Sequence, residues 1–167
     1  MSKTKSFLDF YLGQCPNENG MTIEQIFTFS EEELEAYHNF IQWLFPMTVP
    51  SSVCPEAPLA TPEIISAFKQ DRALQNQLLR ATKMMLAHYG LRLSEDQVLM
   101  SDDFPSKKKN ISGHHLLRIS RILKSLVTLG QQELSHCIFV CLNNLAHSEM
   151  PELQSTVDSY WRAASKP

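Results

Sequence analysis

The chain has 167 residues, 43% of them hydrophobic and 20% charged, and a formal net charge of -3 at pH 7. This composition is typical of a globular domain with one hydrophobic core and excludes a disordered or collagen-like chain. The negative net charge also argues against binding to nucleic acid through bulk charge, although a local basic patch is compatible with it.

The N-terminus and the cysteines bear on the cellular compartment. The first apolar run is interrupted by Asp9, so it does not form a secretory signal, and no uncharged stretch approaches the roughly 20 residues of a membrane span. The four cysteines are scattered and form no Cys-x-x-Cys motif, so we expect reduced thiols. The predicted location is the cytoplasm, or the nucleus if the chain is eukaryotic.

Apolar periodicity and capping residues predict helices along most of the chain. Two capping boxes, Thr22 with Gln25 and Ser30 with Glu33, mark two early helix starts. The expected helices cover residues 6–12, 22–27, 30–45, 61–88, 112–129, 133–145 and 151–161. Within the long pattern at 61–88, a break is expected near Asp71.

The connectors complete the predicted fold. Residues 46–60 hold several prolines, and residues 101–111 form a polar loop with three consecutive lysines. Ser94 and Gln97 predict one more short helical turn, and nothing indicates a pair of strands. The predicted fold class is all-α, a compact single-domain bundle of about six to eight helices that spans residues 1–167, with its core at about 7–160.

The stretch HNFIQWLFPM, residues 38–47, carries polar side chains within an apolar run. On one continuous helix, His38 and Gln42 lie four residues apart at the edge of the apolar face, and Trp43 stands on the far side. We expect a second layer, most simply the helix from Ser112, to bury Trp43. His38 and Gln42 either line a pocket beside it or form hydrogen bonds within the core.

The helix that Ser112 is expected to cap has basic residues on one side. His114, Arg118, Arg121 and Lys124 lie near one face, opposite its apolar residues. This arrangement could hold a small anion at the amide groups of the helix N-terminus. The alternatives are a solvated face beside a disordered basic loop, or ion pairs of the arginines with acidic residues of the helix from Ser30.

No pattern of catalytic or metal-binding residues stands out. Cys137 and Cys141 are four residues apart, but the apolar residues around them favour core positions over a metal site. His88 and Tyr89 precede Gly90, which favours packing at a helix end. We therefore expect no catalytic residues, no metal and no cofactor.

Three blocks of sequence, HNFIQWLFP, MMLAHYGLRL and HHLLRISRILKSLVTLG, closely resemble, in this order and at similar separations, blocks of the opioid growth factor receptor conserved domain. The resemblance extends from FLDFYLG to about Tyr160. The sequence departs from the family between residues 96 and 109 and at His115 and Leu116. It is similar to a short, domain-only member, without the long C-terminal regions of eukaryotic receptors.

The resemblance implies a function in binding. The named receptor binds an enkephalin peptide and is associated with the nuclear envelope and growth inhibition, and the family offers no catalytic motif. We therefore expect a soluble, non-enzymatic ligand-binding or protein-interaction module, with a peptide or protein partner and no membrane span. The alternative is an enzyme or nucleic-acid-binding module that acts on a phosphate-containing ligand near Ser112, although a small anion is favoured there over nucleic acid. The predicted ligand-binding residues are His38, Gln42, Trp43, His114, Arg118, Arg121 and Lys124.

Overall fold

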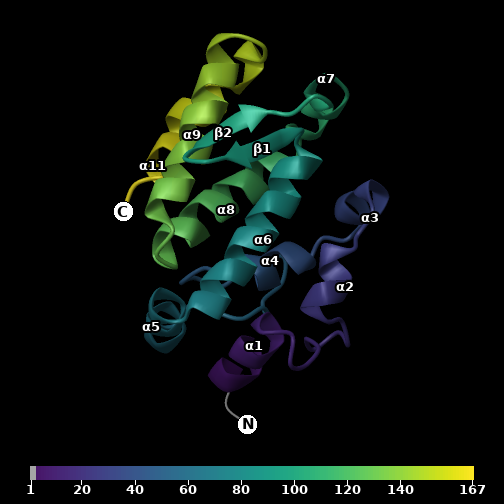
Figure 1. Ribbon diagram of the computed structural model, residues 1–167, viewed down its shortest axis with the longest axis vertical. Coiled ribbons are helices and arrows are strands. Elements are labelled where there is room, and N and C mark those ends of the chain that lie inside the picture. The colour runs from purple at the N-terminus through teal and green to yellow at the C-terminus, as the bar shows by residue number, and fades with distance from the viewer. Residues whose placement is uncertain (1–2) are drawn as a thin grey trace. The chain divides into compact units, whose positions relative to one another are not determined.

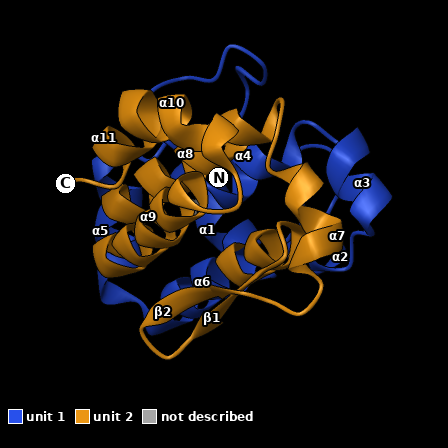
Figure 2. Cartoon of the chain, turned by 90° about the horizontal axis from the view of Figure 1, so that it is seen from above, with its two compact units in different colours: residues 1–81 blue, residues 82–167 orange. Residues whose placement is uncertain are grey.

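The structure is a computed structural model that describes residues 3–167. Most of these residues are helical, as predicted, and a short β-hairpin is added to the helices. Contacts within the chain group the residues into two compact units, unit 1 (Met1–Ala81) and unit 2 (Thr82–Pro167), which are blue and orange in Figure 2. Among the described residues, no helix combines the length and the apolar character needed to cross a membrane.

Unit 1 is built from short helices joined by turns. They are α1 (Lys3–Tyr11), α2 (Ile23–Phe27), α3 (Glu31–Ala36), α4 (Phe40–Leu44), α5 (Pro62–Gln70) and the first part of α6 (Arg72–His88), as Figure 1 shows. Both predicted capping boxes form: the backbone N–H of Gln25 donates to the Thr22 hydroxyl, that of Glu33 donates to the Ser30 hydroxyl, and each N3 side chain accepts from its cap residue. The predicted break before α6 is confirmed at Asp71.

The prediction of one helix over residues 30–45 was wrong. The helix α3 ends at Ala36, Tyr37 has extended backbone angles, and α4 starts at Phe40. The chain turns here because Phe40 is buried with its ring against Phe29, at 5.6 Å between centroids and 85° between planes. An aromatic contact across a turn outweighs the small gain from continuing one helix.

Aromatic side chains form the centre of unit 1. Phe7, Phe10 and Tyr11 of α1 meet Trp43 of α4 and Phe68 of α5, with ring centroids between 4.8 and 6.5 Å apart. The Tyr11 hydroxyl donates to the carbonyl oxygen of Leu44 at 2.8 Å. Through this cluster, three helices that are far apart in sequence share one core.

Unit 2 packs helices and a hairpin together. Its elements are the end of α6, β1 (Leu91–Ser94), β2 (Gln97–Met100), α7 (Phe104–Lys107), the 3-10 turn η1 (Lys108–Asn110), α8 (His115–Thr128), α9 (Gln132–His147), and a C-terminal helical segment of η2 (Pro151–Leu153), α10 (Gln154–Thr156), the π-helical turn η3 (Val157–Trp161) and α11 (Arg162–Ala164). The helices α8 and α9 pack side by side, and the Ser135 hydroxyl of α9 donates to the Leu123 carbonyl of α8 at 2.9 Å. Trp161 Nε1 donates to the Leu116 carbonyl, which fixes the C-terminal segment on α8.

The β-hairpin contradicts the expected helical turn at Ser94 and the expectation of no strand pair. Strands β1 and β2 are antiparallel, and Ser94 pairs with Gln97 across a two-residue turn in which Glu95 has a φ of 52°. Each strand has only four residues, too few for alternation to be distinguished from a helical turn. Pairing places the half-buried Leu93 opposite the buried Val98, and β2 packs on α9.

Candidate functional site

The predicted binding residues of unit 1 lie at the junction of α3 and α4. His38 is exposed and outside both helices, whereas Gln42 and Trp43 are buried in α4. With its amide nitrogen directed at the turn, Gln42 donates to the carbonyl oxygens of His38 at 3.1 Å and Asn39 at 2.9 Å. The prediction that His38 and Gln42 follow one helix edge was therefore wrong. Gln42 instead forms hydrogen bonds with two carbonyl groups of the turn that precedes α4.

The predicted burial of Trp43 is confirmed, since its side chain is only 6% exposed. Its ring lies 6.3 Å from the ring of Phe7 and 5.2 Å from that of Phe10. The indole Nε1 has no hydrogen-bond partner among residues 3–167. Packing against the helix after Ser112 stays a prediction.

Trp43 also lines a cavity of about 450 Å³ in unit 1, which we call the Trp43 cavity. Its walls come from the start of α1, the connector after α4 and the start of α5. The lining is mixed: its apolar part consists of Phe7, Trp43, Pro55, Ala57, Pro58, Leu59 and Ile64, and hydroxyl groups come from Thr4, Ser6 and Thr61. Three charged residues also line it: Lys3, Glu18 and Glu56. Cavities of this size and composition bind small organic ligands and short peptides.

The start of α8 differs from the predicted Ser112 cap. The Ser112 hydroxyl donates to the Lys109 carbonyl at 2.7 Å, and α8 begins at His115, with His114 at the N-cap position and no side-chain cap. The backbone N–H groups of His115 and Leu116 donate to the carbonyls of Ser112 and Gly113. The cap prediction was therefore wrong. The two backbone amides, which could have donated to an anion, donate instead to carbonyls of the turn.

The four basic residues predicted on one side of α8 differ in exposure. His114 and Lys124 are exposed and Arg121 is half-buried, but Arg118 is only 5% exposed. Ser125, which the helical period places on the same side, is fully buried. This side of α8 is therefore not the uniformly solvated face of the simpler alternative. A joint site with His38, Gln42 and Trp43, and the alternative ion pairs of the two arginines, stay predictions.

The lysine run at residues 107–109 is ordered, not disordered. It forms the end of α7 and the turn η1. Lys107 Nζ lies 3.0 Å from the Asp103 carboxylate and donates to the Ala87 carbonyl at 3.0 Å, and Lys108 Nζ lies 3.7 Å from Glu149. Hydrogen bonds from Ser101 and Lys107 lower the pKa of Asp103. Two of the three lysines thus stabilise local structure.

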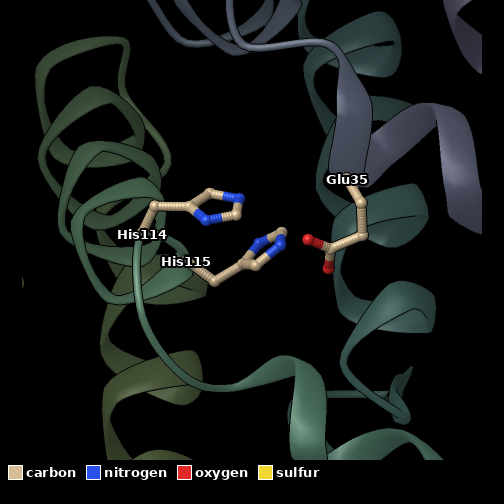
Figure 3. A group of neighbouring side chains, drawn as sticks. All are labelled: Glu35, His114 and His115. Carbon is tan, nitrogen blue, oxygen red and sulfur yellow. The ribbon is translucent and has the colours of Figure 1, made fainter.

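Unit 2 contains a histidine and tyrosine cluster that was not predicted as a group. The Tyr89 hydroxyl lies 3.0 Å from His115 Nδ1, and the ring of His115 lies 5.0 Å from that of His88. His114 lies beside His115, with ring centroids 4.4 Å apart, and Figure 3 draws both rings. His88, Tyr89 and His115 are buried, which agrees with the expected packing at the end of α6. The signal was present in the sequence, because the blocks MMLAHYGLRL and HHLLRIS supply all four rings.

The cysteines of α9 take part in packing. The Cys137 thiol donates to the Asp96 carbonyl at 3.0 Å and so joins α9 to the hairpin turn. Burial raises the pKa of both thiols, that of Cys141 to about 11. Protonated thiols are poor metal ligands, so these residues offer core contacts rather than a metal site.

These features define a mostly helical protein with a cavity of mixed apolar and polar lining. The family model described as the opioid growth factor receptor (OGFr) conserved region matches residues 1–166, and the chain belongs to this family. It is 32% identical over 165 residues to the opioid growth factor receptor of Mus musculus, a match that covers 92% of this chain and 26% of that protein.

Two further relatives have similar coverage. The chain is 33% identical over 156 residues to the opioid growth factor receptor of Homo sapiens, covering 87% of this chain and 23% of the receptor. It is 30% identical over 166 residues to the opioid growth factor receptor-like protein 1 of Mus musculus, a match that covers 93% of this chain and 36% of that protein. The chain thus spans well under half the length of these relatives. No protein of solved structure matches it.

Proposed function

We propose that the chain is a non-enzymatic ligand-binding module of the opioid growth factor receptor type, and that it binds a short peptide of the enkephalin type in the Trp43 cavity. The observation that carries the proposal is the cavity itself, about 450 Å³ in volume, with aromatic, proline and aliphatic side chains in part of its lining. Such walls bind aromatic and aliphatic peptide side chains by removing their apolar surface from water.

The charges of the cavity support a peptide over a purely apolar ligand. Glu18 and Glu56 can attract an amino group, and Lys3 can attract a carboxylate. A free peptide of a few residues carries one charge of each sign at its ends, so it complements this lining. The names of the relatives, which are receptors for an opioid growth factor, agree with a peptide ligand.

Calorimetric titration of the chain with Met-enkephalin tests the proposal. Leu59 lines the cavity and is 36% exposed, so Leu59→Glu should place a charge in the apolar wall and weaken binding at least tenfold. Val53 belongs to the same connector, is 69% exposed and lies outside the lining, which makes Val53→Glu the matched control. No heat of binding, or equal affinity of the Leu59→Glu variant and the parent, would contradict the proposal.

The alternative of a phosphate-containing ligand near Ser112 receives less support. The backbone amides of His115 and Leu116 already donate within the turn, and Lys107 and Lys108 are paired with carboxylates. The proposed module acts in the cytoplasm or nucleus. The four free cysteines, Cys15, Cys54, Cys137 and Cys141, agree with such a reducing compartment.

A further inference from the structure

On the basis of the proposed function, we infer that the carboxylate of Glu56 binds the free α-ammonium group of the peptide in the Trp43 cavity. The cavity therefore selects peptides with an unblocked N-terminus and an aromatic or aliphatic first side chain. Glu56 lines the cavity and is exposed to solvent, so a ligand can reach its carboxylate.

Glu56 belongs to a loop whose two ends are held together. The loop consists of residues 47–60, between α4 and α5. Its ends meet because Met47 and Leu59 form a parallel bridge and the Ala60 N–H donates to the Met47 carbonyl at 2.9 Å. Compact loops with closed ends are packed by their own side chains and frequently carry function.

Hydrogen bonds also fix the interior of the 47–60 loop. The Ser51 hydroxyl accepts the backbone N–H groups of Val53 and Cys54, both at 3.2 Å. The Ala57 N–H donates to the Cys54 carbonyl at 3.1 Å. Cys54 is only 2% exposed, so it anchors the loop in unit 1. The backbone on both sides of Glu56 therefore has a defined position.

The carboxylate of Glu56 is held in place as well. The buried Cys54 thiol donates to Glu56 Oε1 at 3.3 Å. The Glu56 carboxylate has no other hydrogen bond or ion pair with the described residues. A carboxylate has about four acceptor positions, so Glu56 can accept further hydrogen bonds from a ligand. A side chain that is ordered before binding loses less conformational entropy when the ligand arrives.

The other two charged residues of the lining are less well ordered for binding. The side chains of Glu18 and Lys3 form no hydrogen bond or ion pair with any residue in the described range 3–167. Each of them has to lose side-chain freedom when it pairs with a ligand. Among the residues that the structure describes, no cation pairs with Glu56 either. Glu56 is therefore the best prepared of the three to bind an ammonium group.

Apolar side chains adjoin Glu56 in the same lining. Pro55 and Ala57 are its neighbours in sequence, and Pro58 and Leu59 follow. In a free peptide, the carbon that bears the ammonium group also bears the first side chain. An ammonium group at Glu56 therefore brings this side chain to the apolar part of the loop, where its surface is removed from water.

A peptide N-terminus fits this arrangement better than an internal lysine does. The lysine ammonium stands at the end of an unbranched chain and has no apolar side chain beside it. A peptide with a blocked N-terminus has the apolar side chain but lacks the charge that attracts Glu56.

Calorimetric titrations with Met-enkephalin and N-acetyl-Met-enkephalin test the inference. The acetyl group removes the positive charge and leaves every side chain unchanged. The acetylated peptide should therefore bind at least threefold more weakly, as expected for the loss of one exposed ion pair. The difference should shrink at an ionic strength of about 1 M, where the Debye length is only about 3 Å. A peptide with glycine as its first residue keeps the ammonium group and should also bind at least threefold more weakly.

Three variants locate the group that binds the ammonium. Glu56→Gln should abolish the preference for the free N-terminus, because glutamine keeps an acceptor for the Cys54 thiol but carries no charge. Glu18→Gln should reduce the preference by a smaller factor. Glu63→Gln makes the same charge change in the first turn of α5, outside the lining, and should keep the preference of the parent. A circular dichroism spectrum of each variant establishes that it is folded.

The possible failures of this inference and of the proposed function are distinguishable. Equal affinities of the free and acetylated peptides for the parent chain would overturn the inference alone. It would also be overturned by a preference that persists in Glu56→Gln, by an equal loss in Glu18→Gln or Glu63→Gln, or by unchanged affinity of the glycine peptide. If neither Met-enkephalin nor its acetylated form binds, the proposed function and the inference both fail.

Discussion

The side chains of Gln42 and Trp43 show how adjacent residues of one short helix take different roles. Gln42 is buried and uses its amide to satisfy two carbonyls of the turn before α4. Trp43 is buried among aromatic rings, and its indole N–H finds no acceptor in the described part of the chain. A buried donor without an acceptor costs free energy, so the contribution of Trp43 to stability comes from the area and shape of its ring.

Substitutions of Trp43 separate these two contributions. Trp43→Ala should lower the free energy of unfolding by about 3–5 kcal/mol, because it removes a large ring from a packed cluster. Trp43→Phe should cost only about 1–2 kcal/mol, since it keeps much of the ring and loses no hydrogen bond. Urea unfolding monitored by circular dichroism measures both values. Similar losses in the two variants would show that the indole nitrogen has a partner after all.

At the scale of elements, the junction between α6 and β1 depends on Gly90. Its φ of 71° is in the left-handed region, and a Cβ there would lie 2.7 Å from the Cα of Phe104 at the start of α7. The Ser101 N–H also donates to the Gly90 carbonyl at 2.9 Å, which closes the base of the hairpin. Helix, hairpin and α7 can approach one another here only because residue 90 has no side chain.

Gly20 provides the matched control for a test of this junction. Its φ of 75° is nearly the same, but a Cβ there would have nothing within 4 Å. Gly20→Ala should therefore cost only the backbone strain of about 1–2 kcal/mol. Gly90→Ala adds a steric clash and should cost about 2–5 kcal/mol in total. Denaturant midpoints measure the difference, and equal losses would argue against close packing on Phe104.

The predictability of the elements followed from the range of the interactions that form them. The capping boxes at Thr22 and Ser30 were predicted because their hydrogen bonds span three residues and can be read from the sequence. The end of α3 at Ala36 was missed because it depends on the contact of Phe40 with Phe29, eleven positions earlier. The hairpin was missed because its four-residue strands gain their stability from pairing and from α9.

For the whole molecule, family and helical class were predictable, whereas the candidate sites were largely not. The blocks around His38, His88 and His114 identified the family because they are long and specific. Of the predicted ligand-binding residues, only Trp43 lines the proposed peptide site. The Trp43 cavity is made by loops and short helices whose positions depend on tertiary contacts, which no local pattern encodes.

A buried tyrosine in unit 1 and a buried cysteine in unit 2 predict how the stability of the chain depends on alkaline pH. Burial raises the pKa of Tyr11 in unit 1, and it raises the pKa of Cys141 in unit 2 from 9.0 to about 11. Both groups therefore hold their proton more tightly in the folded state than in the unfolded state. Their contribution to the free energy of unfolding is fully present below the unfolded pKa of the thiol. For each group it is lost as the pH rises through the pKa of that group in the folded state.

The free energy of unfolding should accordingly fall between about pH 9 and 11, by at most about 3 kcal/mol for Cys141, since one pKa unit corresponds to about 1.36 kcal/mol. Urea titrations at a series of pH values measure this decline. Cys141→Ala removes the ionisable group and should flatten the pH dependence over this range, whereas Cys15→Ala, at a half-buried position near the end of α1, should decline like the parent. An identical decline in the parent and Cys141→Ala would assign the alkaline sensitivity to other groups, with Tyr11 the first to test by Tyr11→Phe.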